Sequence, residues 1–530
     1  MRYPAKFAFI LGMSFFGPGF LCAQSDKPAE TPAPQAATEE EIVQLRQEVA
    51  ELRATVQQLV RSNLKGAPGE ARLMAANYVA GAARVDSAAL PPETVLPDIA
   101  PPATDLEASL KIAGDTSTPT AGWNGEHFFL RSSDGNFTLM PIGYLNAQYY
   151  VYKGDGAPPD TFAMRRARFG IQGNYGKQLD YGFVMESGSS LTIRDMYLDF
   201  KPWRSFNIMG GQFRVPFSQE ALATETNFEF VELSINSVLY PDASGAFRTP
   251  GIDVHGDLAN GRAQYWVGVF NGQGLLQTGT TNEPEIIGKA RFYPWRQSQN
   301  SWMKGFAIGG SAAHSRSKGL ANELSFSGLM TDNSYTFFPQ FRINGGIERH
   351  NGFFSWVNKG WGVRGEYTQV LEKRTGIGSI VPGGVGFNTL PGVTGKGAYG
   401  MITYLLTGET EPDNAMPLVR HPVIGPNSPG ETGGPGWGAW QLKFRYSWLQ
   451  GRAPGSTCGA NTIPACPITP GIVPTYSDHT SQFTAGLNWY LNYWVLAKTD
   501  LSIDQLKNPS VQGILPRNYF VFAEEIQFRF

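Results

Sequence analysis

The last fourteen residues of the chain, 517–530, read RNYFVFAEEIQFRF and carry an alternating pattern. Most of the apolar side chains share one parity: Phe520, Phe522, Ile526, Phe528 and Phe530. Gln527 and Arg529 fall on the other parity. Because successive side chains of a β-strand point to opposite faces, the segment predicts a strand with one apolar and one polar face. Such a strand borders an apolar medium on one side and water on the other.

The composition extends this pattern to most of the chain. Of the 530 residues, 13% are aromatic and 17% are charged, 62 are glycine, and the net charge is -2. Many aromatics and glycines with few charges fit segments that alternate apolar and polar residues. No internal stretch reaches the ~18 to 20 apolar residues that a membrane-spanning helix needs. The predicted fold class is therefore an all-β transmembrane barrel of about 16 antiparallel strands.

Residues 1–23 have the three parts of a secretory signal peptide. A basic start and an apolar run at 7–21 precede the small residue Ala23, after which cleavage is expected. A short membrane anchor is the alternative, but the apolar run is too short for it. Cys22 as a lipoprotein attachment site is a further alternative, which the preceding residues fit poorly. A Pro/Ala-rich spacer, residues 24–37, opens the mature chain.

Residues 38–65 predict a short periplasmic coiled-coil helix. Apolar side chains recur at alternating spacings of three and four, with β-branched residues at a and leucine at d: Ile42, Leu45, Val49, Leu52, Val56 and Leu59. Thr38 and Glu41 form a capping box at the start of this helix. The choice of residues at a and d favours a two-stranded parallel coil. A lone amphipathic helix packed on its own barrel is the alternative, because so short a coil is near the lower limit of stability.

A flexible linker, residues 66–122, is rich in Ala and Pro and separates the coil from a barrel domain, residues 123–530. Alternation within the barrel domain places strands near 137–153, 164–175, 179–188, 191–201, 206–215, 250–259, 262–270, 286–294, 305–314, 343–357, 361–370, 397–407, 437–449, 481–492, 494–504 and 518–530. An even number of strands returns both ends of the barrel to the periplasmic side. The link 409–435 on that side is long, which leaves the count open by one hairpin.

Six motifs resemble the signatures of one family. They are RRARFG at 165–170, RDMYLDF at 194–200, GQFRVPFSQE at 211–220, LTGE at 406–409, GAWQLKFRYS at 438–447 and GLNWYL at 486–491. The segment 125–530, which carries them in this order, resembles the phosphate-selective porin O and P family. The resemblance implies a trimeric barrel of about 16 strands that passes anions by diffusion, with its third external loop folded inward. It also implies that lysines and arginines lining the pore set the selectivity.

Side-chain parity selects the cations that face the lumen. In strand 437–449 the apolar row from Trp440 to Trp448 faces lipid, so Lys443 and Arg445 face inward. The same reasoning on the other strands completes the set of anion-path candidates: Arg166, Arg168, Lys289, Arg291, Arg364, Lys443, Arg445 and Arg529. Arginine replaces part of the hydration shell of a phosphate with paired N–H donors. The alternative role of these residues is structural, because lumen arginines also pair with carboxylates that hold the wall together.

Carboxylates oppose an anion path, above all in the expected constriction loop, residues 216–249. The charged residues of this loop are Glu220, Glu225, Glu229, Glu232, Asp242 and Arg248. Further acidic residues share the inward parity of the cations: Asp195, Asp199, Glu366 and Glu525. The alternative function is therefore a general or cation-tolerant porin whose coiled coil tethers the outer membrane to the cell wall.

An enzymatic site is a third interpretation of the lumen. Asp253, His255 and Asp257 alternate on one strand face, which is the geometry of an imidazole oriented by carboxylates. No serine or cysteine is tied to them by a local motif, and the sequence contains no HExxH, CxxC or glycine-rich phosphate loop. Polar pore lining explains the trio, and we predict no enzyme, no cofactor and no metal site.

Cys458 and Cys466 are the two cysteines that remain after signal cleavage. Both lie in the loop 451–477, and an exported chain meets an oxidising periplasm. Two cysteines in one flexible loop predict a disulfide between them. Two free thiols or an intermolecular bridge are the alternatives.

Together these features predict an outer-membrane porin for the passive diffusion of small solutes, namely anions such as phosphate or polyphosphate. The expected partners are outer-membrane lipid, small inorganic anions and further copies of the chain in a homotrimer. Peptidoglycan is a further expected partner, reached through the coiled coil, and nucleic acid is not expected. The two-stranded preference of the heptads conflicts with a trimer, so the number of subunits stays open.

Overall fold

The computed structural model describes residues 119–124, 126–154, 157–188, 190–242, 247–279, 282–317, 324–332, 334–375, 389–455, 475–506 and 518–530. The predicted signal peptide 1–23, spacer 24–37, coiled coil 38–65 and most of the linker 66–122 lie outside these residues. Cys458 and Cys466 also lie outside them. Among the described residues, no helix is long and apolar enough to cross a membrane.

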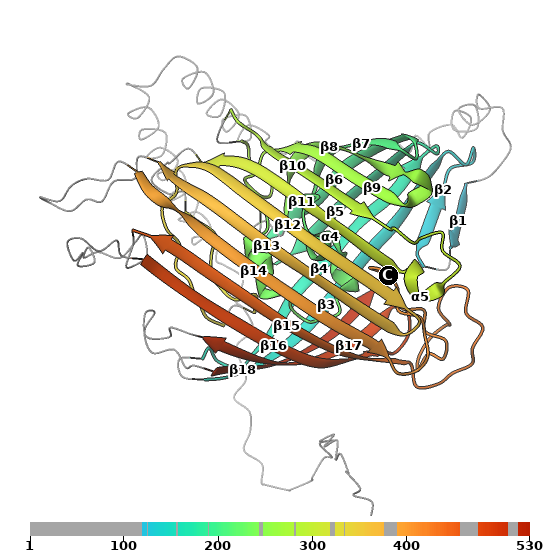
Figure 1. Ribbon diagram of the computed structural model, residues 1–530. Coiled ribbons are helices and arrows are strands. Elements are labelled where there is room, and N and C mark those ends of the chain that lie inside the picture. The colour runs from blue at the N-terminus through green and yellow to red at the C-terminus, as the bar shows by residue number, and fades with distance from the viewer. Residues whose placement is uncertain are drawn as a thin grey trace, which may run out of the picture. The chain divides into compact units, whose positions relative to one another are not determined.

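The chain folds mainly into β-strands that are joined by loops and short helical turns (Figure 1). The strands are β1 (Thr120–Trp123), β2 (Phe128–Arg131), β3 (Phe137–Lys153), β4 (Thr161–Tyr175), β5 (Leu179–Ser187), β6 (Leu191–Trp203), β7 (Phe206–Arg214), β8 (Arg248–Leu258), β9 (Ala263–Phe270), β10 (Glu285–Phe292), β11 (Phe306–Ser317), β12 (Gly345–Asn358), β13 (Trp361–Thr375), β14 (Thr389–Leu405), β15 (Ala439–Pro454), β16 (Thr475–Tyr490), β17 (Val495–Leu506) and β18 (Asn518–Arg529). The helical turns are α4 (Gln219–Leu222), η2 (Glu225–Asn227), η3 (Ile235–Leu239), η5 (Ala259–Gly261) and α5 (Ser301–Lys304).

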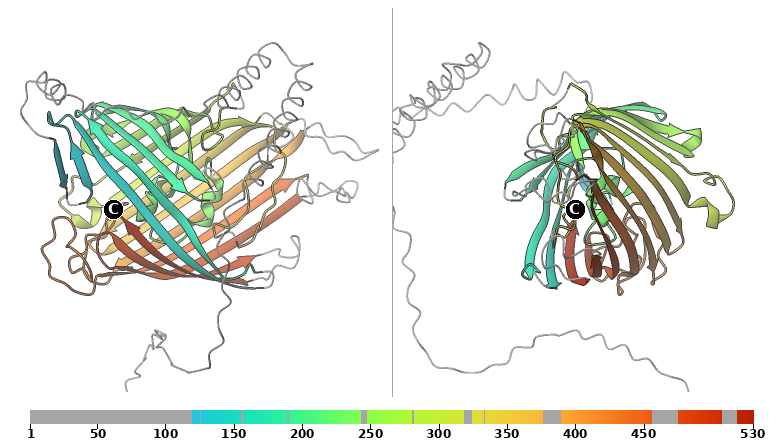
Figure 2. Two further views of the ribbon diagram at one scale, coloured as in Figure 1. Left: turned by 180° about the vertical axis from the view of Figure 1, so that it is seen from behind. Right: turned by 60° about the vertical axis from the view of Figure 1, so that its left-hand side comes forward.

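Sixteen of the strands, β3 to β18, form a closed antiparallel barrel, which Figure 2 shows from two further directions. Each strand pairs with the next one along the chain, and β18 pairs with β3, where Phe528 lies opposite Leu145. The hairpin β1–β2 continues the sheet beside the start of β3. The predicted barrel and its strand count are confirmed. The long link 409–435, which left the count open, lies within the connection 406–438 between β14 and β15, and this connection contains no strand.

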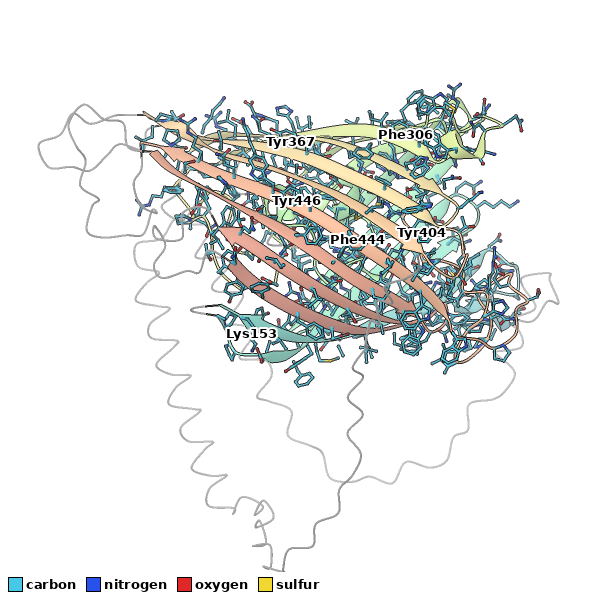
Figure 3. The ribbon with its side chains drawn as sticks, turned by 60° about the horizontal axis from the view of Figure 1, so that its bottom comes forward. Lys153, Phe306, Tyr367, Tyr404, Phe444 and Tyr446 are labelled. Carbon is cyan, nitrogen blue, oxygen red and sulfur yellow. The ribbon has the colours of Figure 1, made fainter. Side chains whose placement is uncertain are left out.

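Outward and inward side chains alternate along the wall as the sequence predicts. In β18, Ile526 is 64% exposed while its neighbour Gln527 is fully buried. The side chains labelled on β13, β14 and β15 lie on the outer face in Figure 3: Tyr367, Tyr404, Phe444 and Tyr446. An apolar exterior around a polar interior inverts the arrangement of a water-soluble domain, and it suits a wall that faces lipid.

The two ends of the barrel differ in their connections. Short turns join β4 to β5, β8 to β9 and β12 to β13 at the end where β3 begins and β18 ends, which we call the turn end. Most connections at the opposite end, which we call the loop end, are longer, including the one between β7 and β8. Exceptions include the long link between β14 and β15 at the turn end and the short link between β5 and β6 at the loop end. Aromatic pairs surround the turn end, among them Trp361 with Tyr404 (ring centroids 4.3 Å apart) and Trp440 with Trp489 (5.0 Å). Aromatic rings favour the level of the lipid headgroups.

Candidate functional site: the constricted lumen

The described residues of the third loop, 215–242 and 247 between β7 and β8, lie inside the barrel. The loop begins with the short helix α4, whose first turn is capped because the Ser218 Oγ accepts from the Ala221 amide (3.1 Å). The same hydroxyl lies 3.1 Å from Glu366 on β13. On a distant part of the wall, Gln527 of β18 donates to the Thr226 carbonyl (3.0 Å). The loop is therefore held at separate points of the wall, and it constricts the lumen.

Several wall cations bind this loop through its main-chain carbonyl groups. The contacts are Lys289 Nζ to the Ser218 carbonyl (2.8 Å), Lys443 Nζ to the Glu229 carbonyl (2.7 Å) and Arg445 Nη1 to the Glu232 carbonyl (2.9 Å). A buried carbonyl needs a donor, and a charged donor makes a stronger bond than a neutral one. Three of the cations that parity placed in the lumen therefore position the constriction.

The other candidate cations also face inward. Their contacts with carboxylates are Arg168 to Glu225 (2.6 Å), Arg291 to Asp413 (2.9 Å) and Arg364 to Glu229 (2.5 Å). Arg166 and Arg529 differ, because neither forms an ion pair within the described part of the chain. Arg166 lies over the ring of Phe228 (5.7 Å to the centroid), and Arg529 donates to the Tyr493 carbonyl (3.1 Å). Neither of these two arginines has a carboxylate in direct contact among the described residues.

Glu225 of η2 is the point where three wall arginines meet. Its carboxylate contacts Arg168 of β4 (2.6 Å), Arg248 of β8 (3.2 Å) and Arg214 of β7, and it is 6% exposed. Arg248, which we expected in the loop, is the first residue of β8, because it lies opposite Arg214 in the β7–β8 ladder. It also contacts Asp195 of β6 (2.8 Å). The cluster thus joins the loop to four neighbouring parts of the wall.

Glu220 of α4 occupies a different environment. Its carboxylate accepts from the main-chain amide (2.7 Å) and hydroxyl (2.6 Å) of Ser234, and Arg445 lies 3.8 Å away. Burial and the nearby Glu366 raise the pKa of Glu220 to about 7, although Arg445 acts in the opposite direction. The charge of this carboxyl group therefore changes near neutral pH.

Two cavities lie beside the third loop. One, of about 400 Å³, we call the arginine cavity, and its charged lining is Arg168, Arg214, Arg248 and Arg529 with Asp195 and Glu225. The other, of about 320 Å³, we call the balanced cavity, and its charged lining is Lys289, Arg291, Arg364 and Arg445 with Glu220, Glu229, Glu232 and Asp413. His127 also lines the arginine cavity, where burial lowers its pKa, so its imidazole is neutral at pH 7.

The described residues of the fifth loop, 324–332 and 334–344 between β11 and β12, also pack inside the barrel. The Phe338 ring is fully buried and stacks on Phe326 (centroids 5.2 Å apart). The same apolar cluster includes Leu239 of η3 in the third loop and Val370 of the wall. Because apolar packing is close and leaves few voids, this cluster narrows the lumen and fixes the third loop from one side. The expectation from sequence concerned the third loop alone.

The trio on β8 does not form a hydrolytic site. His255 Nδ1 lies 3.0 Å from Asp253, and His255 Nε2 lies 3.6 Å from Asp199. Asp257, the third member, accepts from Gln264 (2.9 Å). Both ring nitrogens thus face carboxylates, and neither faces a serine or cysteine that it could activate. The arrangement is polar pore lining.

Arg165 faces the lumen, although side-chain alternation in the sequence did not predict this. It shares the parity of the outward residues, but a β-bulge between β3 and β4 shifts the register at Asn146 and turns it inward. Arg165 donates to the Thr331 carbonyl of the fifth loop (2.8 Å) and lies 3.4 Å from Glu232. The run of three arginines at 165–168 hints at a bulge, because strict alternation would place one of them in lipid.

A protein-family model for phosphate-selective porin O and P matches residues 143–503 of this chain. The chain belongs to this family. The porin family and the barrel make it an outer-membrane porin, a channel and not an enzyme. The resemblance that the six motifs indicated is confirmed over most of the barrel.

Solved structures of several outer-membrane proteins match this chain. A loop-deletion mutant of OmpT from Vibrio cholerae has 9% identity and a TM-score of 0.46, covering 74% of this chain and 100% of that one. OmpF of Salmonella typhi has 10% identity and a TM-score of 0.44, covering 78% and 100%. The outer membrane channel DcaP of Acinetobacter baumannii has 12% identity and a TM-score of 0.39, covering 76% and 99%. The search of curated proteins gave no match.

Proposed function

We propose that this porin conducts small inorganic anions, and that their path runs through the arginine cavity. The observation that carries the proposal is the charge of that lining, in which four arginine side chains face two carboxylate side chains. Arg529 is the member of the lining without an ion pair among the described residues, and its guanidinium contacts a carbonyl and a ring. A fixed positive charge in a narrow lumen attracts anions and repels cations more strongly than it would at an open surface.

Phosphate or polyphosphate is the solute class that this lining fits best. A tetrahedral oxyanion carries several acceptor oxygens, and arginine presents a planar fork of N–H donors to two of them at once. Arg166, which lies over Phe228 and also lacks an ion pair among the described residues, would extend the basic path beyond the cavity.

A general or cation-tolerant porin is the second candidate. The balanced cavity favours it, because four cations there face four carboxylates and the lining has no net preference when all are ionised. The two candidates predict opposite results for one residue. Neutralising Arg529 reduces anion preference if ions pass through the arginine cavity, whereas it changes nothing if they pass only through the balanced one.

Reversal potentials of single channels in a potassium chloride gradient provide the test. Wild type should favour chloride, and Arg529→Gln should move the reversal potential toward zero. Arg316→Gln is the matched control, because Arg316 is exposed at the loop end of β11 and pairs with Glu283 (2.9 Å). Competition by phosphate at millimolar concentration then separates a phosphate path from a general anion path. A wild-type channel that prefers potassium would contradict the proposal.

The N-terminal region is proposed to be periplasmic and to follow a cleaved signal peptide. Short turns, which porins place on the periplasmic side, lie at the end where β3 begins, so the segment before the barrel would emerge there. We propose that the coiled coil joins subunits of a homotrimer or reaches peptidoglycan. Deleting residues 24–118 should leave conductance intact and should abolish sedimentation with purified peptidoglycan, while crosslinking reports the number of subunits.

A further inference from the structure

The outer face of β12–β15 changes from apolar to polar along one cross-strand row. The row is His350, Gln369, Lys396 and Gln450, each directly opposite the next in the ladder. One step nearer the turn end, the outward residues in register are Gly352, Tyr367, Ala398 and Trp448. Because four adjacent strands change character at the same register, the row marks an edge of the lipid-facing surface.

The length of the apolar surface agrees with this placement. On β15 the outward residues from Trp440 to Trp448 are all apolar or aromatic except for the hydroxyl of Tyr446. That row extends ~27 Å along the strand, at ~3.4 Å per residue. With a strand tilt of ~40°, it covers ~21 Å along the membrane normal, close to the ~25 Å of a barrel's apolar band. The next outward residue, Gln450, therefore lies at the level of the lipid headgroups.

Lys396 and Arg452 are two cations at this level with no ion-pair partner in the described ranges of the chain. Lys396 lies opposite Gln450, and Arg452 is two residues further along β15, so the two are diagonal neighbours. Diagonal neighbours on a sheet face are ~7 to 8 Å apart, so both long side chains can contact one group between them. Both are exposed on the outer face.

Two other outward cations at the loop end are paired with carboxylates within the chain. Arg316 pairs with Glu283 (2.9 Å), and Lys373 pairs with Glu348 (3.5 Å). The Lys396–Arg452 pair is thus set apart by its lack of a carboxylate and by its position at the edge of the apolar band. Two unpaired positive charges at the level of the lipid headgroups attract an anionic group of the membrane itself.

We infer that Lys396 and Arg452 bind a phosphate group of a phosphorylated glycolipid of the outer leaflet. Its acyl chains would lie along the apolar surface at Ala398 and Trp448, toward the turn end. The amides of Gln369 and Gln450 flank the pair, and they suit the hydroxyl groups of a sugar better than a small phospholipid headgroup. This inference rests on the proposed orientation, in which the loop end faces the cell exterior.

Native mass spectrometry of the full-length protein in detergent tests the inference with lipid A as the probe. Lys396→Gln combined with Arg452→Gln should weaken lipid A binding about 30-fold, which is about 2 kcal/mol, from ~1 kcal/mol for each cation at a lipid surface. Arg316→Gln combined with Lys373→Gln is the matched control, and it should change binding less than threefold, because these cations already have partners. Lipid A from which the phosphates have been removed should bind wild type as weakly as intact lipid A binds the double variant.

Three outcomes would overturn the inference. In the first, wild type and the double variant bind lipid A equally well. In the second, the control variant loses as much binding as the double variant. In the third, phosphatidylglycerol binds in a way that depends on Lys396 and Arg452, while lipid A does not bind. If the double variant does not fold, the single variants carry the test, each with an expected loss of about fivefold. Single-channel conductance equal to wild type shows that a variant is folded. Ion selectivity is set in the lumen, so a failure of the anion proposal leaves this result unchanged.

Discussion

Replacing Glu225 with glutamine should make the channel more selective for anions. Glutamine keeps the shape of the side chain and removes the charge on which Arg168, Arg214 and Arg248 converge. Arg248 keeps Asp195 as a partner (2.8 Å), but the lining of the arginine cavity as a whole becomes more positive by one charge. The barrel should still fold, because the strand ladders do not depend on this residue. The third loop should loosen, since removing one partner of a buried charge cluster costs ~3 to 5 kcal/mol.

The expected change in selectivity follows from Coulomb's law. One charge added ~6 Å from a passing monovalent ion changes its energy by ~0.7 kcal/mol when the lumen is as polar as bulk water. That energy enriches anions about threefold and depletes cations about threefold, so the permeability ratio changes about tenfold. A less polar lumen enlarges the effect, whereas salt above ~0.15 M screens it.

Reversal potentials in a tenfold gradient of dilute potassium chloride measure the ratio directly. Glu348→Gln is the control, because Glu348 lies on the outer face and pairs with Lys373, away from the ion path. Hydrogen exchange of residues 219–239 reports the loosening of the third loop separately. An unchanged reversal potential together with faster exchange would refute the placement of the ion path beside Glu225, since the loop would have responded while the passing ions did not.

The remaining predictions concern single sites. Because burial raises the pKa of Glu220 to about 7 from an unfolded value of 4.5, the folded chain holds this proton more tightly. The third loop should therefore gain stability as the pH falls from 8 to 6, and Glu220→Gln should remove this change in hydrogen exchange. Phe338→Ala should cost the fifth loop ~3 to 5 kcal/mol of packing and raise single-channel conductance. A synthetic peptide of the predicted coiled coil should show concentration-dependent helicity that Leu52→Asp abolishes, and sedimentation will distinguish two strands from three. Mass spectrometry without reduction should find Cys458 and Cys466 joined, and alkylation of both before reduction would exclude the bridge.

The strands were predictable because one physical rule, alternation between lipid and water, governs every one of them. The rule failed at strand ends. The sequence predicts strands from 397 and 481, whereas β14 begins at Thr389 and β16 at Thr475. In β14 the outward residues Thr394 and Lys396 are polar, so the hydrophobic period stops there while the hydrogen-bonded ladder continues. The hydrophobic period therefore predicted the extent of the apolar band and not the full length of the strand.

The constriction was harder to predict, because its contacts join residues that are far apart in the chain. Side-chain alternation in the sequence correctly placed Lys289 and Arg445 on the inward face of the wall. However, no local pattern shows that they donate to carbonyls of the third loop. The bulge that turns Arg165 inward also has no turn residue to mark it. Side-chain direction is a local property of a strand, whereas the choice of partner depends on how the loops fill the lumen.

The medium that a charged side chain of this porin faces determines which kind of partner the side chain has. Inside the barrel, Lys443 is fully buried and contacts Asp500 (2.5 Å), because an unpaired charge in a narrow lumen lined by protein is costly. Outside the barrel, an unpaired charge such as Lys396 lies at the edge of the apolar band, where the inferred headgroup anion would take the place of a carboxylate. The acidic residues of the third loop therefore do not contradict an anion channel. They neutralise the arginines that build the constriction. Under the proposed function, selectivity would rest on the cations, such as Arg166 and Arg529, that form no ion pair among the described residues.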